Sequence, residues 1–415
     1  MRIALLAVML LSLTHLALAA DGGNAMRPTV NVGITDGDLC GSDHRVLQAA
    51  VDYIAGLGGG TVYLGPGTWT LRDSVRMRSG VAVIGSGPKT ILTKAAGGLS
   101  LLAEDGDYGD VRVLPSDPSG FEVGDGVTVY SDNQRGFHST VGTVVEKGED
   151  GGLTLDAIMN SDFMVAQNAT VSKACPLIRG VDVSDVIVRD LILDGNKENC
   201  PPEDGCRGGA FCTLRASNML ITGVTFRNMN GDGLSFQNSP DVTVEDCIFE
   251  DNAGGGCHPG SGSQRPTVLR SIMRRNGGCG MFVCWRVKHG RFEDNVLEDN
   301  GQMGISNGHK DTDNRFVRNQ IRRNALSGMY FRNEAEHAAG HRCLVQDSII
   351  EDNGHGGEHS GGPAAQIRVD GETNDIVLRG NTVSGDLGVL IGEKVGPVTL
   401  EDNEITGEID DNRSE

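Results

Sequence analysis

Val224-Thr-Phe-Arg-Asn228, Ile248-Phe-Glu-Asp-Asn252, Ile272-Met-Arg-Arg-Asn276 and Val296-Leu-Glu-Asp-Asn300 are four copies of one segment. Their closing asparagines are 24 residues apart, and Asn324 extends the series by one further interval. Such regular spacing indicates a structural repeat. Around the copies, short runs of alternating apolar residues are bounded by Gly, Asn and Asp, which is typical of strands rather than helices. A strand-only unit of 24 residues is typical of one coil of a parallel β-helix, because a propeller blade needs about 40 residues and a leucine-rich repeat needs a regular leucine frame.

The repeated asparagines are interpreted as structural. A side-chain amide both donates and accepts hydrogen bonds, so one asparagine in each coil can bind its equivalent in the next coil. The sequence therefore predicts three parallel sheets and a single line of stacked asparagine side chains that runs from Asn228 to Asn324.

The residues before the repeats predict a cap for the apolar N-terminal end of the solenoid, which must be covered. Residues 43–55 have an amphipathic helical pattern. Its apolar face is made of Val46, Leu47, Ala50, Val51 and Ile54. The predicted helix is followed by Gly58-Gly-Gly-Thr-Val-Tyr-Leu64, Pro66-Gly-Thr68 and Val81-Ala-Val-Ile-Gly-Ser-Gly87.

This succession resembles the opening of the pectate-lyase-like superfamily, which includes pectate lyases, polygalacturonases, alginate lyases and epimerases, and phage tailspikes. The resemblance extends over residues ~40–103 by motif and ~176–405 by the style of the repeats. It implies an all-β fold, namely a right-handed single-stranded parallel β-helix, and activity on a polysaccharide. It does not select one reaction, because this fold carries several chemistries.

Four segments are predicted along the chain. Residues 1–19 are a signal peptide, in which a basic start and an apolar run lead to a small-x-small cleavage site at Ala17-Leu-Ala19. Residues 20–103 are the N-terminal cap and first coils, and residues 176–415 are the main coils and the C-terminal end. Between them, residues 104–175 lack the repeat and predict an inserted β-subdomain. Its tip, Arg135-Gly-Phe-His138, either overhangs a groove or decorates the surface.

Export and charge limit the partners. The apolar run is too short to span a bilayer, so we expect a secreted or periplasmic protein with no membrane attachment after cleavage. We also expect a monomer. The net charge of −20 argues against a nucleic-acid partner. Ten cysteines in an exported chain permit disulfides, and Cys200, Cys206 and Cys212 are predicted to staple a loop. Zinc is disfavoured there because the C-x-x-C pairs of structural zinc sites are missing.

One region of the repeats gathers functional side chains. Residues 24 apart are expected to stack in neighbouring coils, about 4.8 Å from each other. Three columns result: Trp285–His309–Asn333, Arg286–Lys310–Glu334 and His289–Asp313–His337.

The same region is basic in an acidic chain. Residues 264–342 hold 14 Lys/Arg against 8 Asp/Glu, a local charge of +6, so the rest of the chain carries −26. Such a reversal suits an acidic polysaccharide as the partner. Four of the arginines are interpreted instead as turn residues paired with nearby acids: Arg274, Arg275, Arg322 and Arg323.

Three reactions can use these residues. In β-elimination of a uronate glycan, Arg286 or Arg332 neutralises the carboxylate, and Lys310 or His309 removes the proton. In glycoside hydrolysis two carboxylates flank the scissile bond. In a third scheme, a Ca²⁺ ion held by carboxylates bridges to the substrate. The last two schemes draw on the same acids: Asp311, Asp313 and Glu334.

The sequence therefore predicts a lyase that cleaves an acidic polysaccharide, with a glycoside hydrolase or a non-catalytic glycan-binding adhesin as alternatives. No cofactor is required by the pattern, and Ca²⁺ is one option. The candidate catalytic residues are Lys310, His309, Arg286, Glu334, Asp311 and Asp313. The candidate substrate-binding residues are Trp285, Arg332, His289, His337 and Asn307. His258 and Asp370 carry weaker signals, since each is either groove-lining or bound within a turn.

Overall fold

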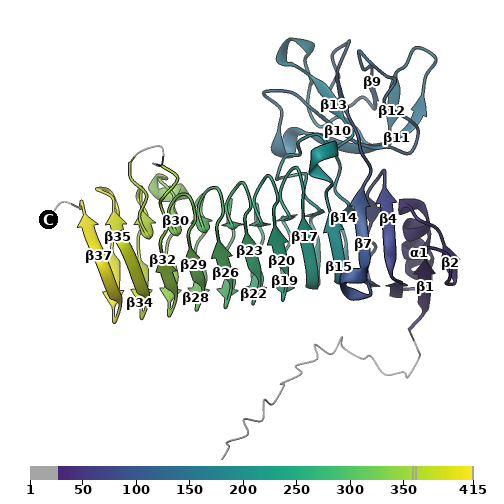
Figure 1. Cartoon of the computed structure of the whole chain (residues 1–415). Helices are drawn as coiled ribbons and strands as arrows, with labels where there is room; N and C mark the ends of the chain where they lie inside the picture. The colour runs from purple at the N-terminus through teal and green to yellow at the C-terminus, as the bar shows by residue number, and fades with distance from the viewer. Residues whose placement is uncertain (1–26, 358, 360–361, 414–415) are drawn as a thin grey trace, which may run out of the picture.

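The computed structural model describes residues 27–357, 359 and 362–413, which form a solenoid of parallel strands (Figure 1). Each strand pairs with its equivalent in the next coil, as β22 (Thr267–Leu269) does with β25 (Arg291–Glu293). The all-β parallel β-helix predicted from the sequence is confirmed, and so are its three sheets. The predicted signal peptide lies outside the described residues.

Three ladders of strands run along the solenoid. The first sheet consists of β14 (Ile178–Val181), β16 (Phe211–Leu214), β18 (Leu234–Gln237), β21 (Cys257–Pro259), β24 (Met281–Phe282), β27 (Ile305–Asn307), β30 (Met329–Phe331) and β33 (Ile367–Val369). The second sheet consists of β19 (Val242–Glu245), β22, β25, β28 (Arg315–Val317), β31 (Leu344–Gln346), β34 (Ile376–Arg379) and β36 (Val398–Glu401). The third consists of β20 (Ile248–Glu250), β23 (Ile272–Arg274), β26 (Val296–Glu298), β29 (Gln320–Arg322), β32 (Ile349–Glu351), β35 (Thr382–Ile391) and β37 (Glu404–Asp411).

The first coils are built from longer or less regular strands. Two long strands, β15 (Ser184–Asp194) and β17 (Ser217–Arg227), each bend around a corner and serve the second and third sheets together. The N-terminal strands are β1 (Thr29–Gly33), β2 (Leu39–Cys40), β3 (Gly60–Leu64), β4 (Gly67–Leu71), β5 (Val75–Arg76), β6 (Val81–Ile84) and β7 (Thr90–Lys94).

The predicted capping helix is confirmed as α1 (His44–Gly56), at the N-terminal end of the coils (Figure 1). Asp43 caps it, since its side chain accepts a hydrogen bond from the backbone N–H of Arg45. The helix buries Leu47, Ala50, Val51 and Ile54 on the apolar core, as the pattern predicts, while Val46 is partly buried. The core beyond it is a column of inward side chains in which like residues stack, as Phe292 does on Phe316 at 5.1 Å.

The asparagine ladder forms, with one correction at its start. Asn252, Asn276, Asn300, Asn324 and Asn353 are linked by amide-to-amide hydrogen bonds of 2.8–2.9 Å. The prediction for Asn228 is wrong: this residue pairs with Asp194, and the place before Asn252 is taken by Met229. The reason is a shorter first interval, because Phe226 pairs with Phe249, 23 residues later, rather than 24.

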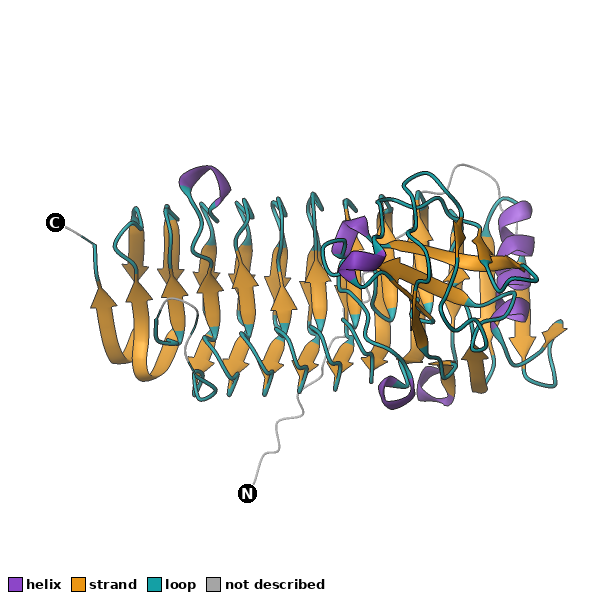
Figure 2. Ribbon diagram, turned by 90° about the horizontal axis from the view of Figure 1, so that it is seen from above, coloured by secondary structure: helices purple, strands orange, loops and turns teal. Residues whose placement is uncertain are grey.

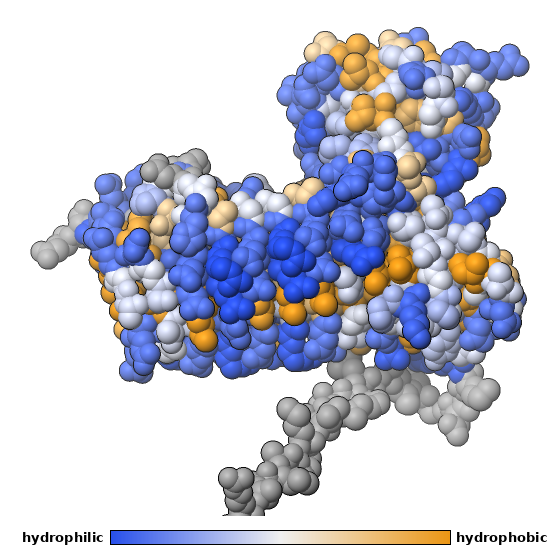
Figure 3. Space-filling view, viewed as in Figure 1, coloured by the Kyte–Doolittle hydropathy of each residue, from blue (hydrophilic) through white to orange (hydrophobic). Residues whose placement is uncertain are grey.

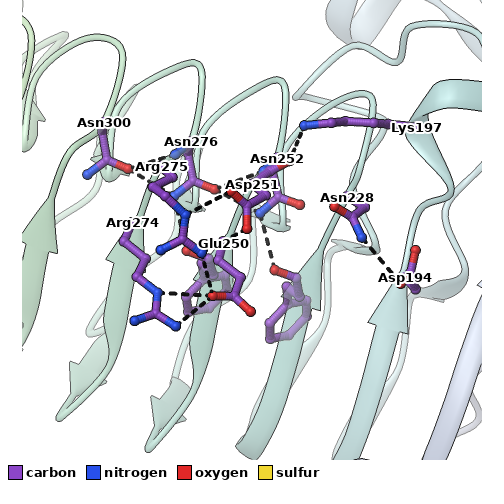
Figure 4. Close-up of polar contacts among 12 residues, drawn as sticks. Asp194, Lys197, Asn228, Glu250, Asp251, Asn252, Arg274, Arg275, Asn276 and Asn300 are labelled. Atoms are coloured by element: carbon purple, nitrogen blue, oxygen red, sulfur yellow. Dashed lines mark hydrogen bonds and ion pairs between the residues drawn. The ribbon is translucent and has the colours of Figure 1, made fainter.

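The corners at both ends of the third-sheet strands use single residues in the left-handed conformation, many of them aspartate or arginine. An arginine in one coil then pairs with an acid in the coil before it, as Arg275 does with Asp251 at 2.8 Å (Figure 4). Figure 3 shows the hydrophilic surface that results over the middle coils. The predicted pairing with nearby acids is confirmed for all four arginines: Arg274, Arg275, Arg322 and Arg323. The predicted turn position is right for Arg275 and Arg323 and wrong for Arg274 and Arg322, which are the last residues of β23 and β29.

The insertion forms a separate antiparallel sheet with its own apolar core. Its strands are β8 (Leu99–Leu101), β9 (Arg112–Val113), β10 (Gly126–Tyr130), β11 (Thr140–Lys147), β12 (Leu153–Leu155) and β13 (Thr170–Ser172), so it begins a few residues before the boundary predicted at 104. Ion pairs such as Arg72–Asp125, 2.8 Å, hold it on the solenoid. Seen from above, it covers the N-terminal coils and leaves the later ones open (Figure 2).

The disulfide staple predicted for residues 200–212 is not formed. All ten cysteines are unpaired thiols. Sγ of Cys200 contacts the carbonyl oxygen of Ala95 at 3.4 Å and Sγ of Cys212 that of Cys206 at 4.0 Å, so these two thiols contact backbone carbonyls rather than another sulfur. Within the described residues, no helix is long and apolar enough to cross a bilayer.

Candidate functional site

The outward face of the first sheet carries a series of polar and aromatic side chains. Strand alternation points every second residue away from the core. In successive coils the outward residue at the same place is Ser235, His258, Phe282, Ser306, Tyr330 and Arg368. A β-helix stacks these positions at about 4.8 Å, so they form one line along the solenoid. Neighbouring side chains cover most of the line, and of these six residues only Phe282 is partly exposed.

Two hollows lie on this face where the insertion and the loop around Cys206 overhang it. One, of about 310 Å³, is lined by Asp232, His258, Phe282 and the loop residue Cys206. The other, of about 370 Å³, is lined by Trp285, Arg286, Cys206 and Phe137 from the insertion. Cys206 borders both, so the two hollows adjoin at this residue, and we call them together the groove. The overhang considered for residues 135–138 is therefore present through Phe137.

An aromatic platform lies beside the second hollow. The ring of His309 stacks on the indole of Trp285 with centroids 4.8 Å apart and planes within 11°. Its Nε2 lies 2.6 Å from Oε1 of Glu334, and its Nδ1 lies 3.4 Å from Sγ of Cys284. Burial and the nearby Arg332 guanidinium lower the pKa of His309 to about 4, so the ring is neutral at pH 7 and Nε2–H donates to Glu334. Trp285 is 50% exposed and offers its free face to a ligand.

The backbone under this platform is strained. Trp285, Arg286, His309 and Lys310 have φ of 66°, 65°, 50° and 67°, so two coils carry consecutive bulky residues in the left-handed region. That conformation costs roughly 1 kcal/mol or more for each such residue. In the preceding coil, Gly262 takes the place equivalent to Arg286, with φ 74°. Large side chains at positions that favour glycine indicate a function for these side chains.

Unpaired positive charge remains at the same turns. Of the 14 basic residues in 264–342, ten form ion pairs with acids. Within the described part of the chain, the four with no ion pair are Arg286, Lys288, Lys310 and Arg315. Arg286 and Lys310 are exposed and flank the platform, with the Arg286 guanidinium 5.9 Å from the Trp285 ring centroid. We call Trp285, Arg286, His309, Lys310 and Glu334 the strip.

The other predicted site residues lie outside the strip. Asp311 and Arg332 are buried beneath it and paired at 3.2 Å. Asn307 is buried within the coil, where it donates to the Asp311 carbonyl oxygen. Asp313 is bound through both oxygens by Arg342 at the next corner, and this contact lowers its pKa to about 2.

The two remaining histidines of the predicted columns are exposed, but neither joins the strip. His289 lies at the same corner as Asp313, and His337 lies in the short 3-10 helix Glu336–Ala338. The carboxylates proposed for Ca²⁺ are engaged separately, and among residues 27–357, 359 and 362–413 no three His, Cys, Asp or Glu side chains form a metal-binding group.

Comparisons with known proteins agree with this architecture. The family described as "Right handed beta helix region" matches residues 164–288. The A-module of Azotobacter vinelandii mannuronan C-5 epimerase AlgE4 superposes on 92% of this chain and 99% of its own, with a TM-score of 0.56 and 15% identity. A structure named a glycoside hydrolase superposes on 91% of this chain and 96% of its own, with a TM-score of 0.59 and 12% identity.

The chain is a right-handed parallel β-helix. A further module, from A. vinelandii mannuronan C-5 epimerase AlgE6, covers 88% of this β-helix and 91% of its own length with a TM-score of 0.54 and 15% identity. No curated protein sequence matches the chain. At these identities the likeness concerns the fold alone.

Sequence reasoning gave too little weight to one pair in the groove of this β-helix. Nδ1 of His258 lies 2.9 Å from Oδ2 of Asp232, and both line the first hollow. The sequence predicts His258 as either a groove-lining or a turn-bound residue and gives no signal for Asp232. The two are 26 residues apart, so no column of 24-residue spacing contains both.

The low pKa of His309 makes a testable contribution to stability. A histidine whose pKa falls from 6.5 to about 4 on folding contributes stability that is complete above pH 6.5 and is lost as the pH falls toward 4. We expect wild-type protein to lose about 1–2 kcal/mol more than His309→Gln between pH 7 and pH 4.5, after allowance for the partial exposure of the ring. Urea unfolding at both pH values measures this difference. His337→Gln, which replaces an exposed ring, should follow the wild type, and parallel behaviour of all three proteins would contradict the assignment.

Proposed function

We propose that this β-helix is an exported lyase that binds an acidic, uronate-containing polysaccharide along the groove and cleaves it by β-elimination. The observation that carries the proposal is the strip, in which a half-exposed tryptophan is flanked by two unpaired cations on strained turns. An aromatic face packs on the apolar face of a sugar ring, and Arg286 and Lys310 are placed to pair with uronate carboxylates. The coils stacked beside the strip allow contact with further sugars of the same polymer.

The charge of the chain supports an acidic ligand bound at this place. The protein as a whole carries −20, so a polyanion is repelled from most of its surface and attracted to the strip. Related folds in the comparisons are named as enzymes of mannuronan and as a glycoside hydrolase, which supports a polysaccharide as the substrate class. Hydrolysis by paired carboxylates is less favoured, because Asp311 is buried beneath the strip and Asp313 is held by Arg342.

β-Elimination requires three groups. A cation must neutralise the uronate carboxylate so that the C5 proton becomes acidic, a base must remove that proton, and an acid must protonate the leaving oxygen. Arg286 and Lys310 supply the first. His309 was predicted as a proton-transfer candidate, yet both of its ring nitrogens are engaged, by Glu334 and by Cys284. We therefore assign it to the platform, where Glu334 and Trp285 fix its ring.

A panel of alginate, pectate, glycosaminoglycans and neutral glucans tests the proposal. We expect new absorbance at the unsaturated-uronate band with at least one acidic polymer and with no neutral polymer. The double variant Arg286→Ala/Lys310→Ala should raise KM by roughly tenfold or more. Arg323→Ala is the matched control, because that guanidinium is already paired with Asp299.

The other outcomes are equally informative. Reducing ends without new absorbance would replace the lyase with a hydrolase. Binding without either product would favour a glycan-binding adhesin. A KM that is unchanged in the double variant would remove the strip from the substrate-binding surface.

A further inference from the structure

His258 is held in one orientation in the wall of the first hollow. It extends outward from β21, and its Nδ1 contacts Oδ2 of Asp232 at 2.9 Å. The second oxygen of Asp232 accepts a hydrogen bond from the backbone N–H of Gly255 at 2.6 Å, which fixes the carboxylate. The two side chains are only 6% and 13% exposed. The Phe282 ring packs against the imidazole in an edge-to-face arrangement, with the ring centroids 5.1 Å apart.

The remaining nitrogen of His258 is free. An ionised carboxylate only accepts hydrogen bonds, so Nδ1 carries the proton and Nε2 holds a lone pair in the neutral ring. Across the described part of the chain, no side chain or backbone group hydrogen-bonds to this Nε2, and it is not a fully buried atom. Since His258 lines the hollow of about 310 Å³, Nε2 is the atom that a bound ligand meets. His309, by contrast, has no free ring nitrogen.

Glycines keep the floor of this hollow open in neighbouring coils. A Cβ on Gly254 would lie 2.4 Å from Oδ1 of Asp232, and one on Gly278 would lie 2.9 Å from the backbone of Gly254. A side chain at either place would therefore displace the Asp232 carboxylate or fill the space in front of it. A carboxylate, an imidazole with a free nitrogen and an open floor together make a site for proton transfer.

The hollow and the strip are spaced for a polymer. His258 is one coil before Phe282 in the same column, and Trp285 follows Phe282 by three residues. The two sites are thus separated by roughly 10 Å along the strand direction and one coil. An oligosaccharide spans that separation, whereas a single sugar does not.

We infer that His258, oriented by Asp232, is the catalytic residue that removes the C5 proton and returns it to the leaving oxygen; this rests on the proposed lyase function. The C5–H bond breaks as its proton passes to Nε2, the electron pair forms the C4–C5 double bond, and the C4–O4 bond breaks. The imidazolium then protonates O4 and becomes neutral again. Asp232 is a positioning residue, which selects the tautomer and stabilises the imidazolium while it lasts.

The inference is tested with His258→Gln and His258→Ala on the acidic polymer that wild-type protein cleaves. We expect kcat to fall at least about 100-fold in both, with KM and polymer binding within threefold of wild type. His309→Ala, in the platform, should instead raise KM more than it lowers kcat. Added imidazole should restore part of the activity of His258→Ala, because the emptied site adjoins the hollow. A purely structural histidine would not show this rescue.

Asp232→Asn gives a second and separate readout. Loss of the carboxylate removes the charge that favours the imidazolium, so the acid limb of the kcat profile should move to lower pH as kcat falls. Asp232→Glu should recover part of the activity.

Failure of the inference can be told from failure of the function. If wild-type protein cleaves a uronan and His258→Gln keeps its kcat within threefold, only the assignment of His258 is overturned. If wild-type protein produces no unsaturated product from any acidic polymer, the lyase function fails and the inference fails with it. Equal thermal melting of wild type and His258→Gln shows that lost activity is not lost folding.

Discussion

Arg332→Met is expected to lower the free energy of unfolding by about 3–5 kcal/mol, because it leaves a buried carboxylate without its positively charged partner. The Arg332 guanidinium binds Oγ of Ser306 and the carbonyl oxygen of Val283, both at 2.8 Å, and Oδ2 of Asp311 at 3.2 Å. It also lies 4.8 Å from the centroid of the Phe282 ring. Asp311 is fully buried, and without Arg332 it keeps only backbone donors such as the N–H of Val287.

The pH dependence of this variant has a definite sign. Burial raises the pKa of Asp311 to about 7, while Arg332 opposes the rise. A carboxyl whose pKa is raised on folding stabilises the protein at low pH and loses that contribution as the pH rises through the folded pKa. Removal of Arg332 raises this pKa further, so the deficit of Arg332→Met should be larger at pH 8 than at pH 5.

Urea unfolding monitored by circular dichroism at the two pH values measures the effect. The double variant Arg332→Met/Asp311→Asn should regain at least half of the lost stability at pH 8, because no charge is left buried. Arg323→Ala, which breaks an exposed pair with Asp299, should cost less than about 1 kcal/mol. A deficit in Arg332→Met no larger than that of Arg323→Ala would mean that the buried pair does not form.

Asn276→Ala is expected to cost about 2–4 kcal/mol, since it interrupts the ladder in the middle of the solenoid. The Asn276 amide donates to the carbonyl oxygen of Phe249 at 3.1 Å and to Oδ1 of Asn300 at 2.9 Å. Its own oxygen accepts from the side-chain and backbone N–H groups of Asn252. The substitution leaves these buried partners unsatisfied on both sides of the gap.

Asn333→Ala is the matched control for the ladder. That residue is exposed on the outside of a turn, so its loss should change stability by less than about 0.5 kcal/mol. Thermal and urea unfolding of the two variants are compared with wild type. Equal stability of the two variants would contradict a stabilising role for the hydrogen-bonded asparagine ladder.

The repeat predicted much of the fold because stacking is a contact between equivalent residues. When every coil has the same length, residue i lies over residue i+24, and the printed sequence then shows which side chains meet. Asn276 over Asn252 and Arg275 over Asp251 both follow from this register. The prediction failed at Asn228, where Phe226 and Phe249 pair at an interval of 23 residues and the register slips by one.

The 24-residue register also predicted part of the strip. Trp285 and His309 are 24 residues apart and stack face to face. Columns do not show which turn residues point outward, however, because left-handed backbone conformations rotate neighbouring side chains to different sides. Asp311 was therefore predicted as a surface acid although it is fully buried, and Glu334 meets His309 across a diagonal rather than in its own column.

By itself the sequence determined the solenoid, its capping helix and the basic region, because these depend on periodicity and local pattern. The position and the walls of the groove were decided only by the tertiary structure. The insertion and the loop at Cys206 are brought over the first sheet by contacts between distant segments, such as Arg72 with Asp125. The pair of Asp232 and His258 likewise joins a corner in one coil to a strand in the next, 26 residues on. Neither contact follows the 24-residue repeat. The spacing of residues in the sequence therefore could not predict it.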